Sequence, residues 1–210
     1  MNGAGDAREF WESRYREREQ TWSGRPNQSL VDVVDDMLPG RALDLGCGEG
    51  GDSIWLAAQG WSVTAVDVSP TALERARRAA TDAGLADNIS WRVHDLAAWE
   101  PEGEFDLVSA CFLQSPVEFP RYEVLRSTAE RLAPNGHLLV VAHASAPPWA
   151  RDRHEGHGPP LLNAEEEVAA LSLPIEQWEV VVAENRPRRV TGPDGEQAEI
   201  LDAVVLVRRR

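Results

Sequence analysis

A glycine-rich segment, Asp44-Leu45-Gly46-Cys47-Gly48-Glu49-Gly50-Gly51, follows a short apolar run and carries the clearest chemical signal in the chain. Glycines at the end of a strand let the backbone turn sharply and approach a ligand at the carboxyl edge of a sheet. Gly46, Gly48 and Gly51 match the spacing of a dinucleotide fingerprint, and Asp67 follows about 20 residues on, where a carboxylate accepts from ribose hydroxyls. The segment therefore predicts a nucleoside-binding crevice without deciding which nucleoside binds there.

Asp44 distinguishes two classes of ligand. A pyrophosphate over the turn would be repelled by a nearby carboxylate, whereas S-adenosylmethionine (SAM) has no phosphate and carries an ammonium and a sulfonium. All 21 basic residues are arginine, so the chain lacks a P-loop lysine, a Schiff-base lysine and the Tyr/Lys pair of short-chain dehydrogenases. We favour SAM, and keep an NAD-dependent oxidoreductase and a non-catalytic SAM-binding protein as alternatives.

A length of 210 residues allows one domain of ordinary size or two small ones, and 42% hydrophobic against 27% charged residues is typical of a globular chain. The formal net charge of −14 repels a phosphate backbone, which disfavours nucleic acid as a partner. The two cysteines, Cys47 and Cys111, cannot build a disulfide framework, and the first residues do not resemble a secretory signal. We expect a cytoplasmic protein that does not bind membranes and is a monomer or a homodimer.

Seven strand-like apolar runs alternate with helical patterns, which predicts a doubly wound α/β sheet with helices on both faces. The runs cover residues 41–45, 61–66, 89–93, 105–110, 137–143, 178–183 and 198–207. Ser69 and Pro70 predict the start of a helix over 71–83, and Asn163 with Glu166 predicts a capping box. Only a turn at 192–195 separates the last two runs, so these strands should form an antiparallel hairpin.

Four motifs, taken in order, resemble those of class I SAM-dependent methyltransferases. They are the glycine-rich segment, Val66-Asp67, His94-Asp95-Leu96 and Phe105-Asp106-Leu107-Val108. The resemblance implies a Rossmann-like seven-stranded sheet in the order 3-2-1-4-5-7-6 with strand 7 antiparallel. It also implies a cofactor site for SAM, with S-adenosylhomocysteine (SAH) as its product. In that site Asp67 would bind the ribose and Val68 would contact the adenine. Asp95 and the Leu96 backbone would bind the edge of the adenine. The methionine end would be held by Asp44, Gly46 and the backbone near Cys111.

A narrower resemblance concerns both ends of the chain. The chain is similar here to TehB-type tellurite-resistance methyltransferases and, more distantly, to thiopurine methyltransferases. The similar parts are Tyr15, the segment Trp22-Ser23-Gly24-Arg25-Pro26, the strand that starts at Trp178 and the turn at 191–195. That similarity implies a small-molecule acceptor, such as a sulfur, selenium or tellurium nucleophile or another small metabolite. The loop at 144–162 and the Arg186-Pro187-Arg188-Arg189 segment depart from this pattern.

The candidates for acceptor chemistry come from strand ends at the carboxyl edge. His143 ends the fifth strand and acts either as a proton acceptor or as a hydrogen-bonded strand end. Arg188 and Arg189 either attract an anionic acceptor and lower the pKa of a bound thiol or are solvated. A thiolate needs no base, whereas a hydroxyl or an amine does. His154 and His157 lack a matching cluster of ligands elsewhere, so we expect no metal site.

We predict that residues 1–28 form a helical lid on a single methyltransferase domain that spans residues 1–210. A helix is expected over 6–19, and Phe10, Trp11, Tyr15 and Trp22 offer aromatic faces that attract a sulfonium. Arg25 either pairs with the methionine carboxylate of the cofactor or is a turn residue. Cys47, in the glycine turn beside Gly48, is expected to pack against the cofactor.

Overall fold

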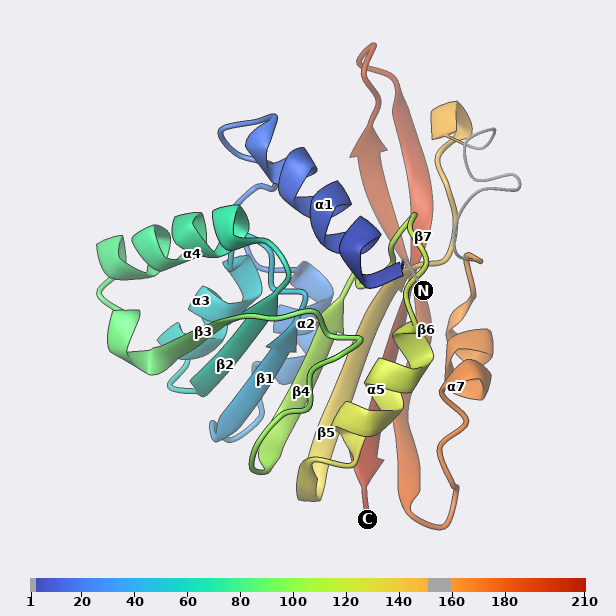
Figure 1. Ribbon diagram of the computed structural model, residues 1–210. Helices are drawn as coiled ribbons and strands as arrows, with labels where there is room; N and C mark the ends of the chain where they lie inside the picture. The colour runs from blue at the N-terminus through green and yellow to red at the C-terminus, as the bar shows by residue number, and fades with distance from the viewer. Residues whose placement is uncertain (1–2, 151–159) are drawn as a thin grey trace.

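The structure is a computed structural model that describes residues 3–150 and 160–210. Within these residues the chain forms a seven-stranded sheet in the order β3-β2-β1-β4-β5-β7-β6 (Figure 1). Neighbouring strands from β3 to β5 are parallel, and β7 runs antiparallel to both β5 and β6. The strand bounds are β1 Arg41–Leu45, β2 Ser62–Asp67, β3 Ile89–Val93, β4 Phe105–Cys111, β5 Leu132–His143, β6 Trp178–Thr191 and β7 Gln197–Arg209. The predicted fold class, strand order and antiparallel last strand are confirmed.

Helices cover both faces of the sheet. Their bounds are α1 Gly3–Arg16, α2 Gln28–Val34, α3 Gly51–Ala58, α4 Pro70–Asp82, α5 Arg121–Ala129 and α7 Ala164–Leu171, with short 3₁₀ turns η1 Ala86–Asn88 and η2 Pro148–Ala150. Leu43 of β1 packs in the apolar cluster that also holds residues of α5 and α7, whereas its neighbour Ala42 packs in the cluster with residues of α2 and α3. Because side chains alternate between faces, a strand buried on both sides reads as a continuous apolar run.

Two helix starts follow the capping chemistry expected from the sequence. The Ser69 side chain accepts from the backbone N–H of Ala72, and Pro70 occupies the first turn of α4. Asn163 and Glu166 form the reciprocal capping box that begins α7. The first of these starts fixes the point at which the chain leaves β2 and its terminal Asp67.

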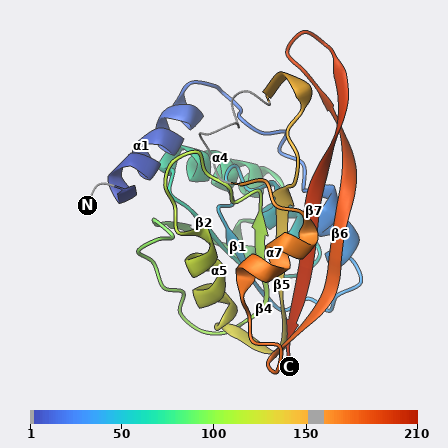
Figure 2. The same cartoon turned by 90° about the vertical axis from the view of Figure 1, so that its right-hand side faces the viewer.

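The β6–β7 hairpin is longer than expected and extends past the end of β5 (Figure 2). The pairing of β5 with β7 ends at His143 and Asp202, whereas β6 and β7 stay paired as far as Thr191 and Gln197. The expected end of the sixth strand at residue 183 was therefore wrong. Residues 184–189 are polar because they lie on an edge strand outside the core, where no apolar alternation marks a strand.

Two other bounds differ from expectation. β5 begins at Leu132 rather than at residue 137, because the turn at Asn135, whose φ is 65°, is an irregularity inside the strand. α1 covers residues 3–16 rather than 6–19, and it lies along the carboxyl edge of the sheet near α4 (Figure 1). In the described part of the chain, the helices are too short or too polar to cross a membrane.

Candidate active site

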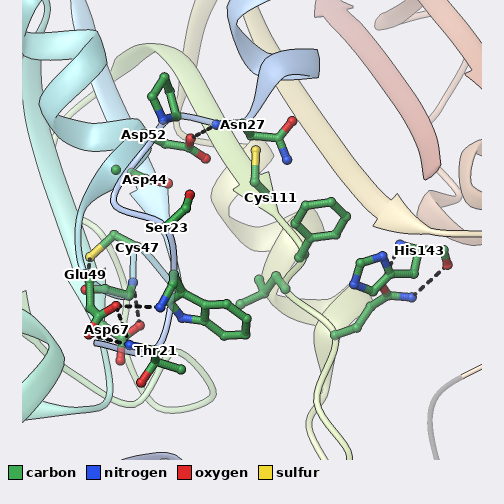
Figure 3. Close-up of a pocket in the computed structure, with 18 of the residues that line it drawn as sticks. Thr21, Ser23, Asn27, Asp44, Cys47, Glu49, Asp52, Asp67, Cys111 and His143 are labelled. Carbon is green, nitrogen blue, oxygen red and sulfur yellow. Dashed lines mark hydrogen bonds between the residues drawn. The ribbon is translucent and has the colours of Figure 1, made fainter. Parts of the chain in front are cut away.

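A cavity of about 990 Å³ lies at the carboxyl edge of the sheet, between the glycine turn, the N-terminal segment and the overhanging part of the β6–β7 hairpin. This volume is at the upper end of the range for small-molecule sites, roughly 300–1,000 Å³. The residues that line the cavity include these candidates from the sequence: Trp22, Arg25, Asp44, Gly46, Cys47, Gly48, Asp67, Val68, Asp95, Leu96, Cys111, His143, Arg188 and Arg189. Figure 3 shows Asp44, Cys47 and Asp67 on one side and His143 on the other, with Cys111 between them.

The turn after β1 forms the floor of the acidic side. Gly46 and Gly48 have φ angles of 68° and 54°, a left-handed conformation that favours glycine. The backbone N–H groups of Gly46 and Cys47 both donate to the carbonyl of Val66, at 2.8 and 3.0 Å, which ties the turn to β2. A Cβ on Gly48 would lie 2.8 Å from the Tyr15 hydroxyl, so the glycine also lets the N-terminal segment approach the turn.

Asp67, at the end of β2, is 6% exposed and lies beside this turn. Its Oδ2 accepts from the N–H of Gly48 at 2.9 Å, and its Oδ1 accepts from the N–H of Ser69 at 2.8 Å. Burial raises the pKa of Asp67 to about 6, because the backbone hydrogen bonds only partly offset the loss of solvent. Each carboxylate oxygen keeps a further lone pair with which to accept from a ligand hydroxyl.

Asp44, at the end of the neighbouring strand, is 2% exposed. It accepts hydrogen bonds from the hydroxyls of Ser53, at 2.6 Å, and Ser109, at 3.2 Å. Burial, together with the nearby Asp52, raises the pKa of Asp44 to about 7. Among the described residues, neither Asp44 nor Asp67 has an ion-pair partner. Because burying an unpaired charge is costly, this side of the cavity fits a cationic ligand and disfavours a pyrophosphate.

Asp52 adds a third carboxylate that the sequence analysis missed. It lies in the first turn of α3, and its Oδ1 accepts from the backbone N–H of Asn27 at 2.5 Å (Figure 3). Burial raises its pKa, and burial likewise raises the pKa of the thiols of Cys47 and Cys111 well above the ordinary value. A thiol in that state is a poor nucleophile, so both cysteines pack as small side chains.

The opposite end of the cavity is aromatic and basic. Phe112 follows β4 with a φ of 56°, a strained conformation that costs a bulky residue ~1–3 kcal/mol. Its ring stacks on the imidazole of His143, with ring centroids 4.2 Å apart, and lies 5.4 Å from the guanidinium carbon of Arg188. His143 Nδ1 lies 3.1 Å from Oδ1 of Asp202, and Arg188 binds the same carboxylate through Nε and Nη2. Arg188 is therefore neither free nor merely solvated.

The other arginines at the rim differ in their partners. Arg186 pairs with Glu184 of its own strand and with Asp32 of α2. Arg189 and Arg25 line the cavity without an ion pair to any residue in the described ranges 3–150 and 160–210. These two guanidinium groups keep their charge available to a bound anion.

No metal site was expected from the pair His154 and His157, and both residues lie outside the described part of the chain. Within the described residues, no group of three or more histidine, cysteine or carboxylate side chains is arranged to hold a metal ion.

Comparisons with known proteins agree with the chemistry of the acidic side. The family model described as a methyltransferase domain matches residues 42–136. Thiocyanate methyltransferase 1 of Arabidopsis thaliana is 31% identical over 151 residues, which are 68% of this chain and 66% of the relative. The 2-heptyl-1-hydroxyquinolin-4(1H)-one methyltransferase of Mycobacteroides abscessus is 29% identical over 147 residues, 67% of this chain and 64% of the relative. The alignments thus span just under two thirds of these relatives.

The solved structure of TehB from Haemophilus influenzae has the same fold, with a TM-score of 0.71 and 20% identity over 95% of this chain and 67% of that chain. The sequence motifs, the order of the strands in the sheet and the similar proteins all indicate the same family. The chain belongs to the class I SAM-dependent methyltransferases. This confirms the family that the sequence motifs resembled and sets aside the NAD-dependent oxidoreductase.

The matched family region contains Phe112 but none of the titratable side chains that surround it at the basic end of the cavity. His143, Arg188 and Asp202 all follow residue 136, outside the matched region. The first two were predicted from the sequence as site residues, and Asp202 was not. One feature of the sequence points to Asp202: it is a carboxylate directly before the apolar run 203–207. That run lies on β7, which pairs with β5.

The N-terminal segment of the methyltransferase closes one side of the cavity. Tyr15 and Trp22 are joined by a hydrogen bond from the indole N–H to the phenol oxygen at 2.9 Å, and both lie close to Gly48. Trp11 also lines the cavity, whereas Phe10 packs edge-on against Trp11 and is not part of the lining. Glu49, which the sequence analysis treated only as part of the glycine motif, accepts from the backbone N–H groups of Thr21 and Trp22.

Proposed function

We propose that this methyltransferase transfers a methyl group from SAM to a small-molecule acceptor that carries or develops negative charge. The acceptor is a sulfur, selenium or tellurium nucleophile or another small metabolite. The observation that supports this proposal is the polarity of the cavity. Buried carboxylates line the side next to the glycine turn, and His143 lies on the other side (Figure 3). Phe112 and Arg188 adjoin His143, and Arg189 also lines the cavity.

The acidic side has groups suited to each part of SAM. Asp67 would accept from the ribose hydroxyls, and Val68, Asp95 and Leu96 would surround the adenine. In the methionine part of SAM, Asp44 and Asp52 would stabilise the ammonium group and Arg25 would bind the carboxylate. The methionine part would be surrounded by Trp22, Gly46, Cys47, Gly48 and Cys111. When bound, SAM supplies an electrophilic methyl group on a sulfonium.

The protein promotes methyl transfer mainly by positioning the two reactants and by excluding water from the site. Holding two reactants in line in a closed site can lower a barrier by roughly 7–11 kcal/mol in favourable systems. We propose that residues 1–28 are the lid of a single domain spanning residues 1–210, because Tyr15 and Trp22 lie over the glycine turn and Trp11 lines the cavity. Such a lid excludes water from the space where the methyl group moves.

The basic side supports an acceptor that is anionic when it reacts. Arg189 is not committed to an ion pair with any described residue, and Arg188 and His143 face the same space. The two relatives are named for thiocyanate, a small anion, and for a hydroxyquinolone, a small molecule with an ionisable hydroxyl. These names support the size and charge of the acceptor without fixing its identity.

The test is a methyl-transfer screen with labelled SAM, preceded by calorimetric titration with SAH and with NADH. We expect SAH to bind and NADH not to bind. We further expect turnover with at least one member of a panel of thiols, thiocyanate, selenite, tellurite, halides, phenols and N-hydroxy heterocycles. Binding of SAH with no turnover anywhere in the panel would favour the non-catalytic alternative, and no binding of SAH would overturn the assignment of the crevice.

A further inference from the structure

Three side chains from three adjacent strands meet at the basic end of the cavity. His143 of β5 and Asp202 of β7 are directly paired across the two strands, so their side chains share one face of the sheet. Nδ1 of His143 lies 3.1 Å from Oδ1 of Asp202. Arg188 of β6 donates to the same carboxylate, with Nε at 2.5 Å from Oδ2 and Nη2 at 3.2 Å from Oδ1.

The chemistry of the partners fixes the histidine tautomer. Nη2 of Arg188 also lies 3.4 Å from Nδ1 of His143, but a guanidinium only donates and an ionised carboxylate only accepts. A proton on Nδ1 satisfies the shorter contact, the one to Asp202. Neutral His143 therefore carries its proton on Nδ1 and has its lone pair on Nε2.

Asp202 is ionised in this arrangement. It is 3% exposed, and although burial opposes ionisation, hydrogen bonds from His143 and Arg188 hold its pKa below the ordinary value. A buried carboxylate on Nδ1 both orients an imidazole and stabilises the imidazolium that forms when Nε2 takes a proton.

The ring of His143 is also held in its plane. Phe112 stacks on it at an interplanar angle of 23°, and the Gln114 side chain bonds both the N–H and the carbonyl of the His143 backbone, at 2.7 and 3.2 Å. The side chain is still 40% exposed, and Figure 3 shows the ring turned toward the part of the cavity where Cys111 lies. No described residue forms a hydrogen bond with Nε2.

We propose that His143 is the general base of this site, positioned by Asp202, and that the acceptor carries a weakly acidic hydroxyl on a flat aromatic or heteroaromatic ring. The inference rests on the proposed function and narrows its acceptor. A base is needed only where the nucleophile reaches the site with a proton; a thiocyanate or a halide has none to give. The flat ring follows from the lining, which includes Phe112, Phe119 and Trp11.

The hydroxyl proton passes to Nε2 of His143 while the oxygen forms a bond to the methyl carbon and the carbon–sulfur bond of SAM breaks. The products are a methyl ether, neutral SAH and an imidazolium paired with Asp202, which later returns its proton to solvent. Besides Asp202, Arg188 of β6 lies beside this imidazole, and Arg186 and Arg189 of the same strand line the cavity, with Asp32 of α2 paired to Arg186.

The first test needs no turnover. Imidazole nitrogen shifts measured by NMR report the tautomer, and with only five histidines in the chain the signals of His143 can be assigned by their loss in His143→Gln. We expect the Nδ1–H tautomer in the wild type and a mixture of tautomers in Asp202→Asn. A wild-type protein in the Nε2–H form would overturn the inference, since Nε2 could not then accept a proton.

The second test compares acceptors with and without a proton. With phenol and 1-hydroxyquinolin-4-one as hydroxyl acceptors, His143→Gln should lower kcat at least ~100-fold, because a general base contributes roughly 10²–10⁴-fold. With thiocyanate and iodide the same variant should stay within about threefold of the wild type. Asp202→Asn should also lower kcat for the hydroxyl acceptors and spare thiocyanate and iodide, because the imidazolium loses the carboxylate that stabilises it.

Glu184→Gln is the matched control, because it removes one carboxylate from the same hairpin and leaves the three-residue cluster intact. An SAH affinity close to wild type shows that each variant is folded. Equal losses with both acceptor classes, an unchanged rate with the hydroxyl acceptors, or a wild type that methylates only thiocyanate and iodide would each overturn the inference. A wild type that binds SAH but methylates neither class would instead contradict the proposed function, and the tautomer measurement would still decide the arrangement of His143.

Discussion

Glu49 holds the backbone of Trp22 against the glycine turn, with its Oε2 accepting from the Trp22 N–H at 2.8 Å. The same carboxylate accepts from the N–H of Thr21 and pairs at 2.8 Å with Arg75 of α4. Arg75 in turn donates to the backbone carbonyl of Tyr15. One buried carboxylate thus connects the proposed lid to the turn that forms the cofactor side of the cavity.

Replacing Glu49 with Gln should loosen this connection. A glutamine loses the ion pair with Arg75 and keeps only one accepting oxygen, with two lone pairs, for three donors: the N–H groups of Thr21 and Trp22 and the Arg75 guanidinium. At least one of these donors therefore loses its partner. We expect faster amide hydrogen exchange over residues 15–25 and an SAH affinity lower by about tenfold, which corresponds to the loss of one charged hydrogen bond. Exchange mass spectrometry and calorimetry measure the two effects. Glu17→Gln, an exposed residue just after α1, should change neither, and an unaltered exchange rate in the Glu49 variant would argue against the connection.

Binding of SAM should depend on pH through Asp44. Its pKa is raised to about 7 in the ligand-free protein, so lowering the pH protonates it and removes the charge that attracts a cation. Between pH 8 and pH 5.5 we expect the affinity to fall roughly ten- to thirtyfold, and binding near pH 6.5 to release protons. Calorimetry in buffers of different ionisation enthalpy measures both quantities. The Asp44→Asn variant should bind SAM weakly, and its affinity should show only the smaller pH dependence due to Asp67, whose pKa is raised to about 6. A wild-type affinity for SAM that rises as the pH falls would rule out a cation-binding role for Asp44.

Asp67→Ala should weaken SAH binding by about 10- to 100-fold, because charged hydrogen bonds to the ribose would be lost, each worth roughly 1.5–3 kcal/mol. The variant also frees the N–H groups of Gly48 and Ser69, so its melting temperature has to be measured alongside. Asp106→Ala, which removes a carboxylate bonded to the Arg41 N–H at the opposite end of the sheet, is the control for stability alone. An affinity for SAH equal to that of the wild type would contradict the ribose assignment.

The repeating elements of the fold were predictable because each is encoded locally. An apolar run marks a strand buried on both faces, and Ser69 with Pro70 marks a helix start through a hydrogen bond within four residues. The cofactor side was predictable for the same reason: Asp44 and Asp67 end strands that adjoin each other in the sheet, and the glycines between them have to adopt left-handed backbone angles.

The acceptor side depends on register, which no local pattern encodes. Asp202 faces His143 only because β7 pairs with β5 in one particular alignment, and a shift by one residue would place it on the other face of the sheet. Arg188 was expected at the rim, but its commitment to Asp202 follows from the same register. Glu49 and Asp52 were missed because their partners, Trp22 and Asn27, approach from the N-terminal segment, more than twenty residues away in sequence.

The two arginines that the sequence treated alike should behave differently when mutated. Arg189→Ala removes an uncommitted charge at the rim, so we expect KM for an anionic acceptor to rise about fivefold with kcat unchanged. Arg188→Ala also releases Asp202, so kcat should fall as well for an acceptor that has to lose a proton. Steady-state kinetics with one anionic and one neutral acceptor separates the effects. If both variants raise KM equally and leave kcat alone, the link from Arg188 to Asp202 has no part in turnover.

Removing one charge from a buried ion pair away from the cavity should lower the free energy of unfolding strongly. Arg121 of α5 and Glu167 of α7 are 7% and 0% exposed, with Nη1 3.0 Å from both carboxylate oxygens. Glu167→Gln leaves the guanidinium buried without a counter-charge, so urea unfolding should show a loss of roughly 3–5 kcal/mol. Glu165→Gln, on the exposed face of the same helix turn, should cost less than about 0.5 kcal/mol. The double variant Arg121→Met with Glu167→Leu should recover most of the loss because it removes both charges at similar volume. A Glu167 variant no less stable than the Glu165 variant would mean that water reaches this pair and screens it.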